Sequence, residues 1–432
     1  MRHARIPVAF AAVLLCAAAG GAATAQRARV ADARMGPVAT AIRAEAGGDL
    51  RKFYAARNYR PLWAATGRIG PEAATLLGYL RSARLDGLDP ADYDVDGLRQ
   101  SIAAARTPQQ IARAELALSA AFARYVRDQR EPGDAEMTFA DKKLRPGKLS
   151  EETVLRAAAF PKNFTAYVAG MGWMSEHYVR LRALMKRARD DGATRATLDR
   201  LALNLDRARL LPGPAVRHIV VDASSGRLWY YQAGKQVGTM RVVVGAPETQ
   251  TPMLAGMLQW AVLNPYWNVP DYLVRDDVAP KVLAGRSLSS LKMEALDGWG
   301  SNAAKIPSAS IDWSAVAAGR RIPRVRELPW AGNSMGKAKF LFPNKLGIYL
   351  HDTPKRDLLK KENRHFSNGC IRLEDAATLG RWLLQRPLRA PSKAPEQAVA
   401  LPVQVPVYLT YLTATPTKKG IGFRKDVYGR DG

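Results

Sequence analysis

"VRHIVVDASSGRLWYYQAGKQVGTMRVVVG", residues 216–245, changes the period of the chain from that of helices to that of strands. It holds three runs rich in β-branched and aromatic residues, separated by a Ser-Ser-Gly turn and an Ala-Gly turn at hairpin spacing. Further strand-like runs follow, at residues 258–263, 339–342, 348–350 and 403–413. We therefore predict that the second part of the chain is mostly β.

The part of the chain before Pro212-Gly213-Pro214 has helical periodicity instead. Two apolar faces recur at helical spacing, one of Ala73, Leu76, Leu77 and Leu80 and one of Leu118, Phe122, Tyr125 and Val126. A further helical region covers about residues 178–209. We expect all of these faces to be core.

These patterns together predict an α+β protein. A helical scaffold domain is expected over residues 26–213, and a mostly β domain over 214–390. Residues 391–432 are expected to complete the second domain with a strand and a tail. The stretch 271–330 is less regular, so we predict an insertion that covers part of the sheet.

Residues 1–25 have the pattern of a secretory signal peptide, with a positive start, an apolar run at 6–19 and the cleavage site Ala23-Thr24-Ala25. Cys16 would be removed with this segment. We do not expect its lipidation, because Leu15 is bulky where a small residue is needed. The apolar run is shorter than the ~20 residues of a membrane span. The sequence therefore predicts a periplasmic protein, which is tethered at its N-terminus if the signal is not cleaved.

Composition sets limits on the partners of the chain. It has 432 residues, of which 47% are hydrophobic, and a net charge of +26, so two or more domains with proper cores are expected. Basic proteins often bind nucleic acid, but export and the lack of an aromatic-and-basic motif argue against it. We expect an anionic partner outside the cytoplasm, such as the cell wall or a membrane surface. A solvated basic surface without a partner is the alternative.

Only one cysteine lies outside the predicted signal peptide, in "RHFSNGCIRLED", residues 364–375. Without a second cysteine, Cys370 has no partner for a disulfide within the chain. It is either a small buried hydrophobe or a reactive thiol. Its polar neighbours favour the second reading, and a helix is predicted after Glu374 and Asp375. Cys370 is therefore expected in a strand-to-helix loop, where catalytic groups are common.

A thiol nucleophile needs a base, because only the thiolate attacks. Two histidines lie close in sequence, His351 directly after the apolar run "IYL" and His365 five residues before the cysteine. A strand end holds a side chain in a defined direction, whereas His365 belongs to the charged loop "KRDLLKKENRH". We predict His351 as the base, with His365 as the rival.

The motifs around these residues carry a resemblance. "FLFPNKLGIYLHDTP" followed by "FSNGCIRLED" resembles the catalytic signature of the L,D-transpeptidases with a YkuD-type domain, and fifteen residues lie between His351 and Ser367, as in that signature. The stretches "VVVGAPETQTPMLAG", "LNPYWNVP" and "FRKDVYGRD" resemble the long, YcbB-like branch of the family. "FYAARNYRPLW" and "ARLDGLDPADY" resemble its N-terminal scaffold. The resemblance thus covers most of the chain after residue 25 and implies a catalytic domain of the YkuD β-sandwich or barrel type.

Two departures accompany the resemblance. Asn368 stands where the family most often has histidine. The segment 178–214 is too short for the peptidoglycan-binding module that the long branch often carries. Contact with the wall is then expected from the scaffold and the basic surface.

The resemblance implies a place in peptidoglycan biosynthesis, cell wall organisation and cell shape, with no cofactor or metal. Cys370 would form a thioester with the third residue of a stem peptide, releasing D-alanine, and an amine of a second stem would resolve it as a 3→3 cross-link. Water as acceptor would make the protein an L,D-carboxypeptidase. A lysine of an outer-membrane lipoprotein as acceptor would attach that protein to the wall. β-Lactams of the carbapenem class are the implied inhibitors.

Roles follow for the other residues of the signature. The backbone amides of Gly369 and Cys370 are expected to face the oxyanion. Arg372 is expected either to bind a substrate carboxylate or to pair with Glu374 or Asp375. The remaining candidates are Ser367, which orients His351 or completes the turn, Asn368 as a positioning residue, and Tyr349 and Trp267, which line the groove or belong to the core.

Three other classes remain open. A cysteine peptidase of the wall would also use cysteine and histidine, but its familiar families have the opposite order along the chain. A zinc site of His351, His365 and Cys370 has spacings that fit no common ligand pattern. A non-catalytic wall-binding protein that keeps the fold is the third.

Overall fold

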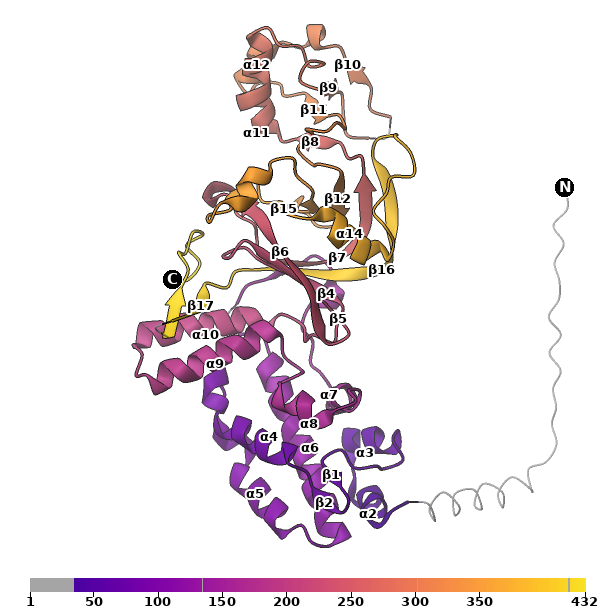
Figure 1. Ribbon diagram of the computed structural model, residues 1–432, viewed down its shortest axis with the longest axis vertical. Coiled ribbons are helices and arrows are strands. Elements are labelled where there is room, and N and C mark those ends of the chain that lie inside the picture. Colours follow the sequence, from indigo (N-terminus) through magenta and orange to yellow (C-terminus); the bar gives the residue numbers. More distant parts are fainter. Residues whose placement is uncertain (1–34, 134, 301, 419) are drawn as a thin grey trace, which may run out of the picture. The chain divides into compact units, whose positions relative to one another are not determined.

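The computed structural model describes residues 35–133, 135–300, 302–418 and 420–432 (Figure 1). The predicted signal peptide, residues 1–25, lies outside the described residues, as does Cys16. Two compact units make up the chain. The first holds the described residues up to Arg81 with Asp89–Val126 and Leu149–Thr165, and the second holds Ser82–Leu88, Arg127–Lys148 and Ala166–Gly432.

The first unit is built mainly of helices. They are α2 (Pro37–Glu45), α3 (Gly48–Ala55), α4 (Glu72–Arg81), α5 (Val95–Ala104), α7 (Glu151–Ala159) and most of α6 (Pro108–Arg130), with a small hairpin of β1 (Ala64–Ala65) and β2 (Arg68–Ile69). The apolar faces predicted on α4 and α6 are buried, which confirms them as core. The core also encloses the carboxylate of Glu115, which accepts hydrogen bonds from the Tyr54 hydroxyl (2.6 Å) and the Trp63 backbone N–H (3.0 Å).

The second unit contains helices and the main sheet. Its long helices are α9 (Glu176–Asp190) and α10 (Arg195–Arg209), and α8 (Phe164–Ala169) lies at the division between the units. Ser175 and Thr194 cap α9 and α10 by accepting backbone N–H groups. The compact units divide the chain differently from the predicted domains, because α9 and α10 belong to the second unit. The predicted domain limits stay a prediction.

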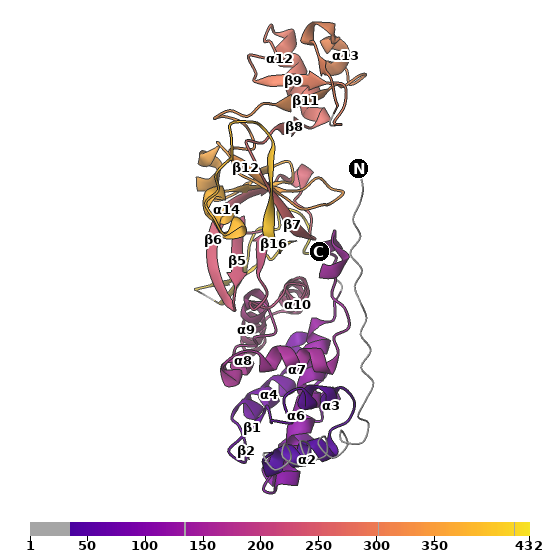
Figure 2. The same cartoon turned by 90° about the vertical axis from the view of Figure 1, so that its right-hand side faces the viewer.

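Ten strands form the main sheet of the second unit (Figure 2). They are β3 (Thr138–Phe139), β4 (His218–Asp222), β5 (Arg227–Gln232), β6 (Lys235–Gly245), β7 (Leu254–Leu263), β12 (Ala338–Leu341), β13 (Leu350–His351), β14 (His365–Ser367), β15 (Ile371–Leu373) and β16 (Gln397–Thr410). The order is β12-β13-β15-β6-β5-β4-β16-β7-β3, and β14 pairs with β6. Because β12 also pairs with β7, the sheet closes on itself in the manner of a barrel.

The three runs of residues 216–245 form the antiparallel strands β4, β5 and β6, as their spacing predicts. The connection between β5 and β6 is the two-residue turn Ala233-Gly234, and both residues have positive φ. This geometry matches the twist of the flanking strands. The hydrophobic residues of β4, β6, β7 and β16 share one core with helix α14 (Ala376–Leu384), the helix predicted after Cys370.

The insertion is more regular than its sequence indicates. Its strands β8 (Trp267–Val269), β9 (Met293–Leu296), β10 (Lys305–Ile306) and β11 (Arg324–Glu327) form a separate four-stranded sheet, with the helices α11 (Asp271–Leu273), α12 (Ala279–Leu283) and α13 (Trp313–Ala317). A hydrophobic cluster of its own includes Val274, Trp313 and Val325. Its strands are only two to four residues long, too short for periodicity to reveal them.

The described chain ends in a hairpin of β17 (Ala414–Thr417) and β18 (Gly420–Phe423). Asp431 then pairs with Arg207 of α10 (2.7 Å), and both side chains are buried. Within the described ranges, no helix combines the length and the apolar composition that crossing a membrane requires.

Candidate active site

Two short parallel strands, β13 and β15, bring the predicted base and nucleophile together. Leu350 pairs with Ile371 and His351 with Arg372. Leu350 and Ile371 are fully buried in the core. Since side chains alternate along a strand, His351 and Arg372 point to the opposite face of the sheet. Cys370 directly precedes β15, and both its thiol and His351 interact electrostatically with Arg372.

The side chain of Cys370 is partly exposed. Its Sγ donates to the carbonyl oxygen of Gly347 at 3.5 Å. Burial raises the pKa of the thiol to about 11, although hydrogen bonds from Tyr349 and the positive charge of Arg372 oppose that shift. Tyr349 therefore lies at the site, beside the sulfur, and Cys370 is a neutral thiol at neutral pH.

His351 is held as a neutral imidazole with one defined tautomer. Its side chain is almost completely buried, and Nδ1 lies 2.6 Å from the carbonyl oxygen of Asp352. Nδ1 therefore carries the proton and donates it, which leaves the lone pair on Nε2. Burial lowers the pKa of His351 to about 3, with further lowering by Arg372 and Lys339. The ring is unprotonated at neutral pH and can accept a proton on Nε2.

The pH dependence of thiol reactivity follows from these two pKa values. With a neutral thiol beside a neutral imidazole, the alkylation rate of Cys370 by iodoacetamide should rise about tenfold per pH unit from pH 7 to about 10. The rate is measured by peptide mass spectrometry of residue 370 over a pH series. A plateau that begins below pH 8 would mean a preformed thiolate–imidazolium pair and would contradict this description.

A hydrogen-bonded turn precedes the cysteine. The Ser367 hydroxyl donates to the carbonyl oxygen of Cys370 (2.5 Å) and accepts the Gly369 N–H (3.2 Å). Gly369 has a φ of +101°, and a Cβ there would lie 3.1 Å from Ile348 Cδ1. Glycine is thus required by both backbone conformation and space. Ser367 binds within the turn, and its hydroxyl takes no contact from His351.

The predicted oxyanion donors need a correction. The Gly369 amide donates to Ser367 and so does not face the substrate side. For the Cys370 amide, no acceptor occurs among the described residues. One of the two predicted donors is therefore free for an oxyanion and the other is used to build the turn.

Two threonines that the sequence did not single out support this turn from the loop after β6. The Thr251 hydroxyl donates to the carbonyl oxygen of Gly369 at 2.8 Å, and that of Thr249 donates to Ser367 O at 3.0 Å. Both belong to "VVVGAPETQTPMLAG", the stretch noted only for its resemblance. Nothing in their spacing indicates a partner more than a hundred residues away along the chain.

Arg372 does not form the salt bridges considered as its alternative. Glu374 pairs with Arg241, and Asp375 caps α14 by accepting the Thr378 N–H at 2.8 Å. Within the described part of the chain, the Arg372 guanidinium has no ion-pair partner. It interacts electrostatically with Cys370, and burial lowers its pKa. A cation held next to the thiol without a counter-ion fits a substrate carboxylate.

Comparison with known proteins adds a second line of evidence to this geometry. Residues 216–405 match the family model described as the L,D-transpeptidase catalytic domain, YkuD, and this range contains both His351 and Cys370. The chain carries the catalytic domain of the L,D-transpeptidase family. Residues 48–185 match a model described as a scaffold domain. The matches confirm the predicted family and, with the observed helices and sheet, the α+β fold.

One curated relative of this L,D-transpeptidase domain protein is a Haemophilus influenzae protein named "Putative L,D-transpeptidase", 34% identical over 242 residues. The match covers 54% of this chain and 48% of the relative, so the chain spans about half the length of that protein.

Solved structures show weaker likeness. An L,D-transpeptidase from Mycobacterium smegmatis is 13% identical with a TM-score of 0.23, covering 45% of this chain and 58% of that one. The catalytic domain of an Enterococcus faecium L,D-transpeptidase is 16% identical with a TM-score of 0.19, covering 45% and 95%. Likeness at these scores adds nothing to the assignment.

In the L,D-transpeptidase domain, His365 is bound away from the thiol. Its Nδ1 lies 2.6 Å from Asn363 Oδ1, and its ring meets Tyr428 edge-on with centroids 5.3 Å apart. Burial lowers the pKa of His365. Asn368, predicted as a positioning residue, is exposed and bonds to no described residue. A positioning role for Asn368 stays a prediction.

Of the two aromatic candidates, one lies at the thiol and the other does not. Tyr349 lies at the thiol, with its ring centroid 5.8 Å from that of His351, whereas Trp267 packs against the core of the insertion. Tyr272 of α11 was not predicted. It is 38% exposed, and its pKa is raised by burial and by the charge of Cys370. The insertion thus brings a tyrosine close enough to Cys370 to interact electrostatically with its sulfur.

The zinc alternative receives no support. Among the described residues, no group of three or more His, Cys, Asp or Glu side chains is arranged to hold a metal ion. His351 and His365 bind a backbone carbonyl and an asparagine instead. The expected absence of a metal in this L,D-transpeptidase domain stays a prediction.

Proposed function

We propose that the protein is a peptidoglycan L,D-transpeptidase that forms 3→3 cross-links through a thioester on Cys370. The observation that carries the proposal is the arrangement of Cys370 and His351. Cys370 directly precedes β15, which pairs in parallel with the strand of His351, and the Asp352 carbonyl leaves His351 Nε2 free to accept a proton. This is the combination of nucleophile and oriented base that acyl transfer needs.

In the first step, Sγ of Cys370 attacks the carbonyl carbon that joins the L-centre of meso-diaminopimelate to D-alanine. His351 Nε2 takes the thiol proton as the C–S bond forms. The Cys370 amide is placed to stabilise the oxyanion, and Arg372 is suited to the carboxylate of the donor stem. The C–N bond then breaks, the proton passes from His351 to the leaving amine, and D-alanine departs from the thioester.

In the second step, the side-chain amine of another stem attacks the thioester. His351 Nε2 accepts a proton from that amine, the C–S bond breaks as the new amide forms, and His351 returns the proton to the sulfur of Cys370. One amide bond replaces another, so the reaction needs neither ATP nor a cofactor. Attack by water would give an L,D-carboxypeptidase, and attack by a lipoprotein lysine would attach a protein to the wall.

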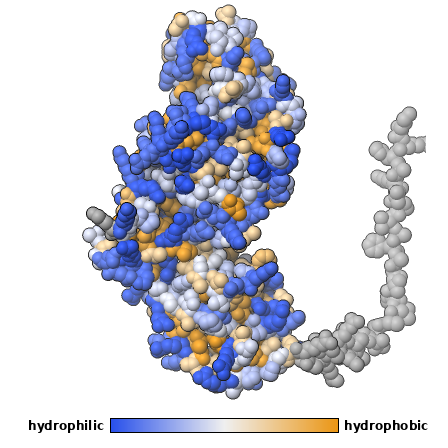
Figure 3. Space-filling model, viewed as in Figure 1, coloured by the Kyte–Doolittle hydropathy of each residue, from blue (hydrophilic) through white to orange (hydrophobic). Residues whose placement is uncertain are grey.

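The proposal extends to the place of action, the periplasm, where the predicted export signal would direct the chain. The net charge of +26 suits contact with an anionic wall. Hydrophilic side chains cover much of the face drawn in Figure 3. The segment between His351 and Cys370 also carries exposed cations, Lys355, Lys360 and Lys361. Carbapenems are proposed as inhibitors because their strained acyl group would react with the same thiol.

Product analysis tests the function. The purified protein is incubated with disaccharide-tetrapeptide, and the products are examined by mass spectrometry. We expect a cross-linked dimer that is lighter than two substrates by one D-alanine. Disaccharide-tripeptide as the sole product would replace the transpeptidase by a carboxypeptidase, and unchanged substrate would favour a wall-binding protein without activity.

A further inference from the structure

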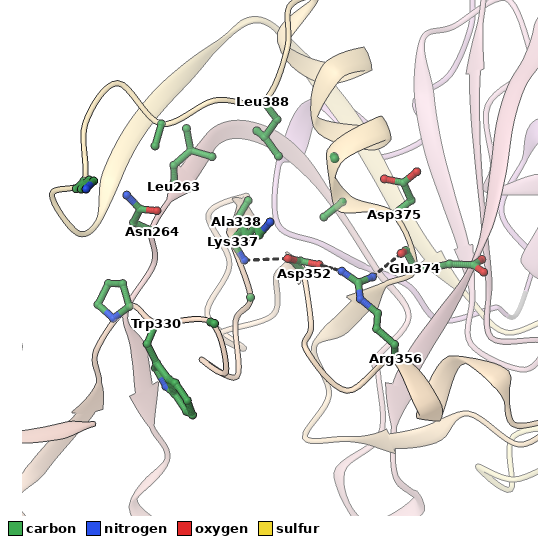
Figure 4. Close-up of a pocket in the computed structure, with 17 residues that line it drawn as sticks. Leu263, Asn264, Trp330, Lys337, Ala338, Asp352, Arg356, Glu374, Asp375 and Leu388 are labelled. Carbon is green, nitrogen blue, oxygen red and sulfur yellow. Dashed lines mark hydrogen bonds and ion pairs between the residues drawn. The ribbon is translucent and has the colours of Figure 1, made fainter. Parts of the chain in front are cut away.

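Asp352 contacts the proposed base in an unusual way, through its backbone, while its side chain is fixed from two other segments. Its carbonyl oxygen accepts the Nδ1–H of His351. Its carboxylate accepts the Lys337 backbone N–H at 2.9 Å and the Nη2–H of Arg356 at 2.5 Å. Figure 4 shows the carboxylate between these two donors. The Asp352 side chain is only 9% exposed, so this binding is largely shielded from water.

The other terminal nitrogen of Arg356, Nη1, contacts the carboxyl end of β15. Nη1 donates to the carbonyl oxygen of Glu374 at 2.5 Å and lies 3.4 Å from that of Leu373, the last residue of β15. One guanidinium therefore joins the residue after β13 to the end of β15 (Figure 4). The planar fork of arginine suits such a double contact, and a lysine cannot reproduce it.

We propose that Arg356 is a positioning residue for His351, acting through Asp352. The inference rests on the proposed roles of His351 and Cys370. Arg356 holds the peptide whose carbonyl orients the imidazole, and it fastens the strand of the base to the strand of the thiol. It touches neither reacting group itself.

The strands β13 and β15 are too short to fix each other firmly, so the bridge that Arg356 makes between Asp352 and Glu374, here called the clamp, is needed. β13 has two residues and β15 three, and only two residue pairs join them. Beyond that, Asp352 is held by its own N–H, which donates to Ala338 O at 2.8 Å. Misplacement of a catalytic group by about 1 Å can slow a reaction about 10²-fold, so a contact that fixes such a short ladder matters for rate.

The turn around the carboxylate is shaped to admit it. Gly336 has a φ of +60°, and a Cβ there would lie 2.4 Å from Asp352 Oδ2. The neighbouring cavity of about 840 Å³ is lined by Lys337, Asp352, Arg356 and Glu374, among others. The Arg356 side chain is 48% exposed at its edge. An ion pair open to water on one side contributes little to stability.

Three groups face His351 and influence which of its ring nitrogens carries the proton. They are the cations Arg372 of β15 and Lys339 of β12, together with the Asp352 carbonyl. Lys339 is itself paired with Glu396 at 2.6 Å. Neither cation forms a hydrogen bond with Arg356, so a change of the His351 tautomer in Arg356→Ala would come from displacement of the Asp352 carbonyl.

The test compares Arg356→Ala and Arg356→Lys with Arg195→Ala in the full chain. Arg195 pairs with Asp199 four residues away on α10, but both of these side chains are exposed, so this variant controls for the loss of a surface arginine alone. We expect Arg356→Ala to slow carbapenem acylation of Cys370 about tenfold or more, with Arg356→Lys restoring only part of the rate. Arg195→Ala should acylate at the normal rate.

A spectroscopic reading separates positioning from stability. In ¹⁵N-histidine spectra, we expect a single His351 tautomer with the proton on Nδ1 for the normal protein and for Arg195→Ala. A mixture of tautomers is expected for Arg356→Ala. If Arg356→Ala does not fold, Arg356→Lys decides by the same two readings.

Two results would overturn the inference: an acylation rate within twofold of normal, or a lower rate with an unchanged tautomer. His351→Ala is measured in parallel. If His351→Ala is acylated at the normal rate, His351 is not the base and the proposed function is contradicted. If His351→Ala is slow while Arg356→Ala is normal, only the positioning role of Arg356 is contradicted.

Discussion

Replacing Cys370 by alanine is expected to abolish both cross-linking and covalent labelling by a carbapenem. Cys370 is the one cysteine of the described residues, and the residues that follow it pair with the strand of His351, the proposed base. Without it no thioester forms, and the effect should be complete within detection. Intact-protein mass after incubation with a carbapenem measures it directly, as the normal protein should gain the mass of the drug.

Cys370→Ser is the matched control, because it keeps the size and polarity of the side chain. A hydroxyl is a weaker nucleophile with a far higher pKa, so neutral His351 should activate it poorly. We expect a folded protein without lasting adduct. Equal labelling of Cys370→Ala and the normal protein would show that the nucleophile lies elsewhere.

Replacing His351 by alanine is the second large effect that we expect. The loss of a placed base should slow acylation and cross-linking about 10²-fold or more. The imidazole has its lone pair on Nε2 and its pKa at about 3, so it is ready to accept a proton at neutral pH. Acylation rates by stopped-flow or mass spectrometry, at fixed pH and drug concentration, give the comparison.

The rival base gives the matched control for this prediction. His365→Ala should lose at most a few-fold, because His365 binds Asn363 and packs on Tyr428. Asn368→His, which restores the residue most common in the family, should leave the protein active, since position 368 faces solvent. A dead His365→Ala together with a live His351→Ala would reverse the assignment.

The fold was predicted well in those segments where apolar residues recur with the period of a strand or a helix. The hairpins of 216–245 follow from alternation and from two-residue turns, and the buried faces of α4 and α6 follow from helical spacing. The family resemblance rested on His351, Ser367 and Cys370 at their spacing. These features are local or nearly so, which is why a single sequence carries them.

The remaining features depend on contacts between distant segments. The sequence placed Arg372 near two acids, but Glu374 is taken by Arg241 from β6 and Asp375 by the helix that it caps. It offered Gly369 as an oxyanion donor, but the amide is used by Ser367. Competition among partners decides both cases, and only the folded chain shows which partner wins.

The clamp of Asp352 and Arg356 illustrates the same limit. In the sequence, Asp352 and Arg356 are only an acid and a base four positions apart, like many other i,i+4 pairs. Their importance comes from the Glu374 carbonyl, which the parallel pairing of β13 and β15 brings within reach. Parallel pairing of two short strands has no signature in sequence periodicity.

The central claim is that Cys370 carries the acyl group of a stem peptide. The most direct measurement is the intact-protein mass shortly after mixing with disaccharide-tetrapeptide whose side-chain amine is blocked by acetylation, before a stem with a free acceptor amine is added. We predict a gain equal to the acetylated disaccharide-tripeptide acyl group, located at Cys370 by peptide mapping and lost when the amine is supplied. Cross-linked product formed at the normal rate by Cys370→Ala, with no acylated protein at any time, would contradict the account.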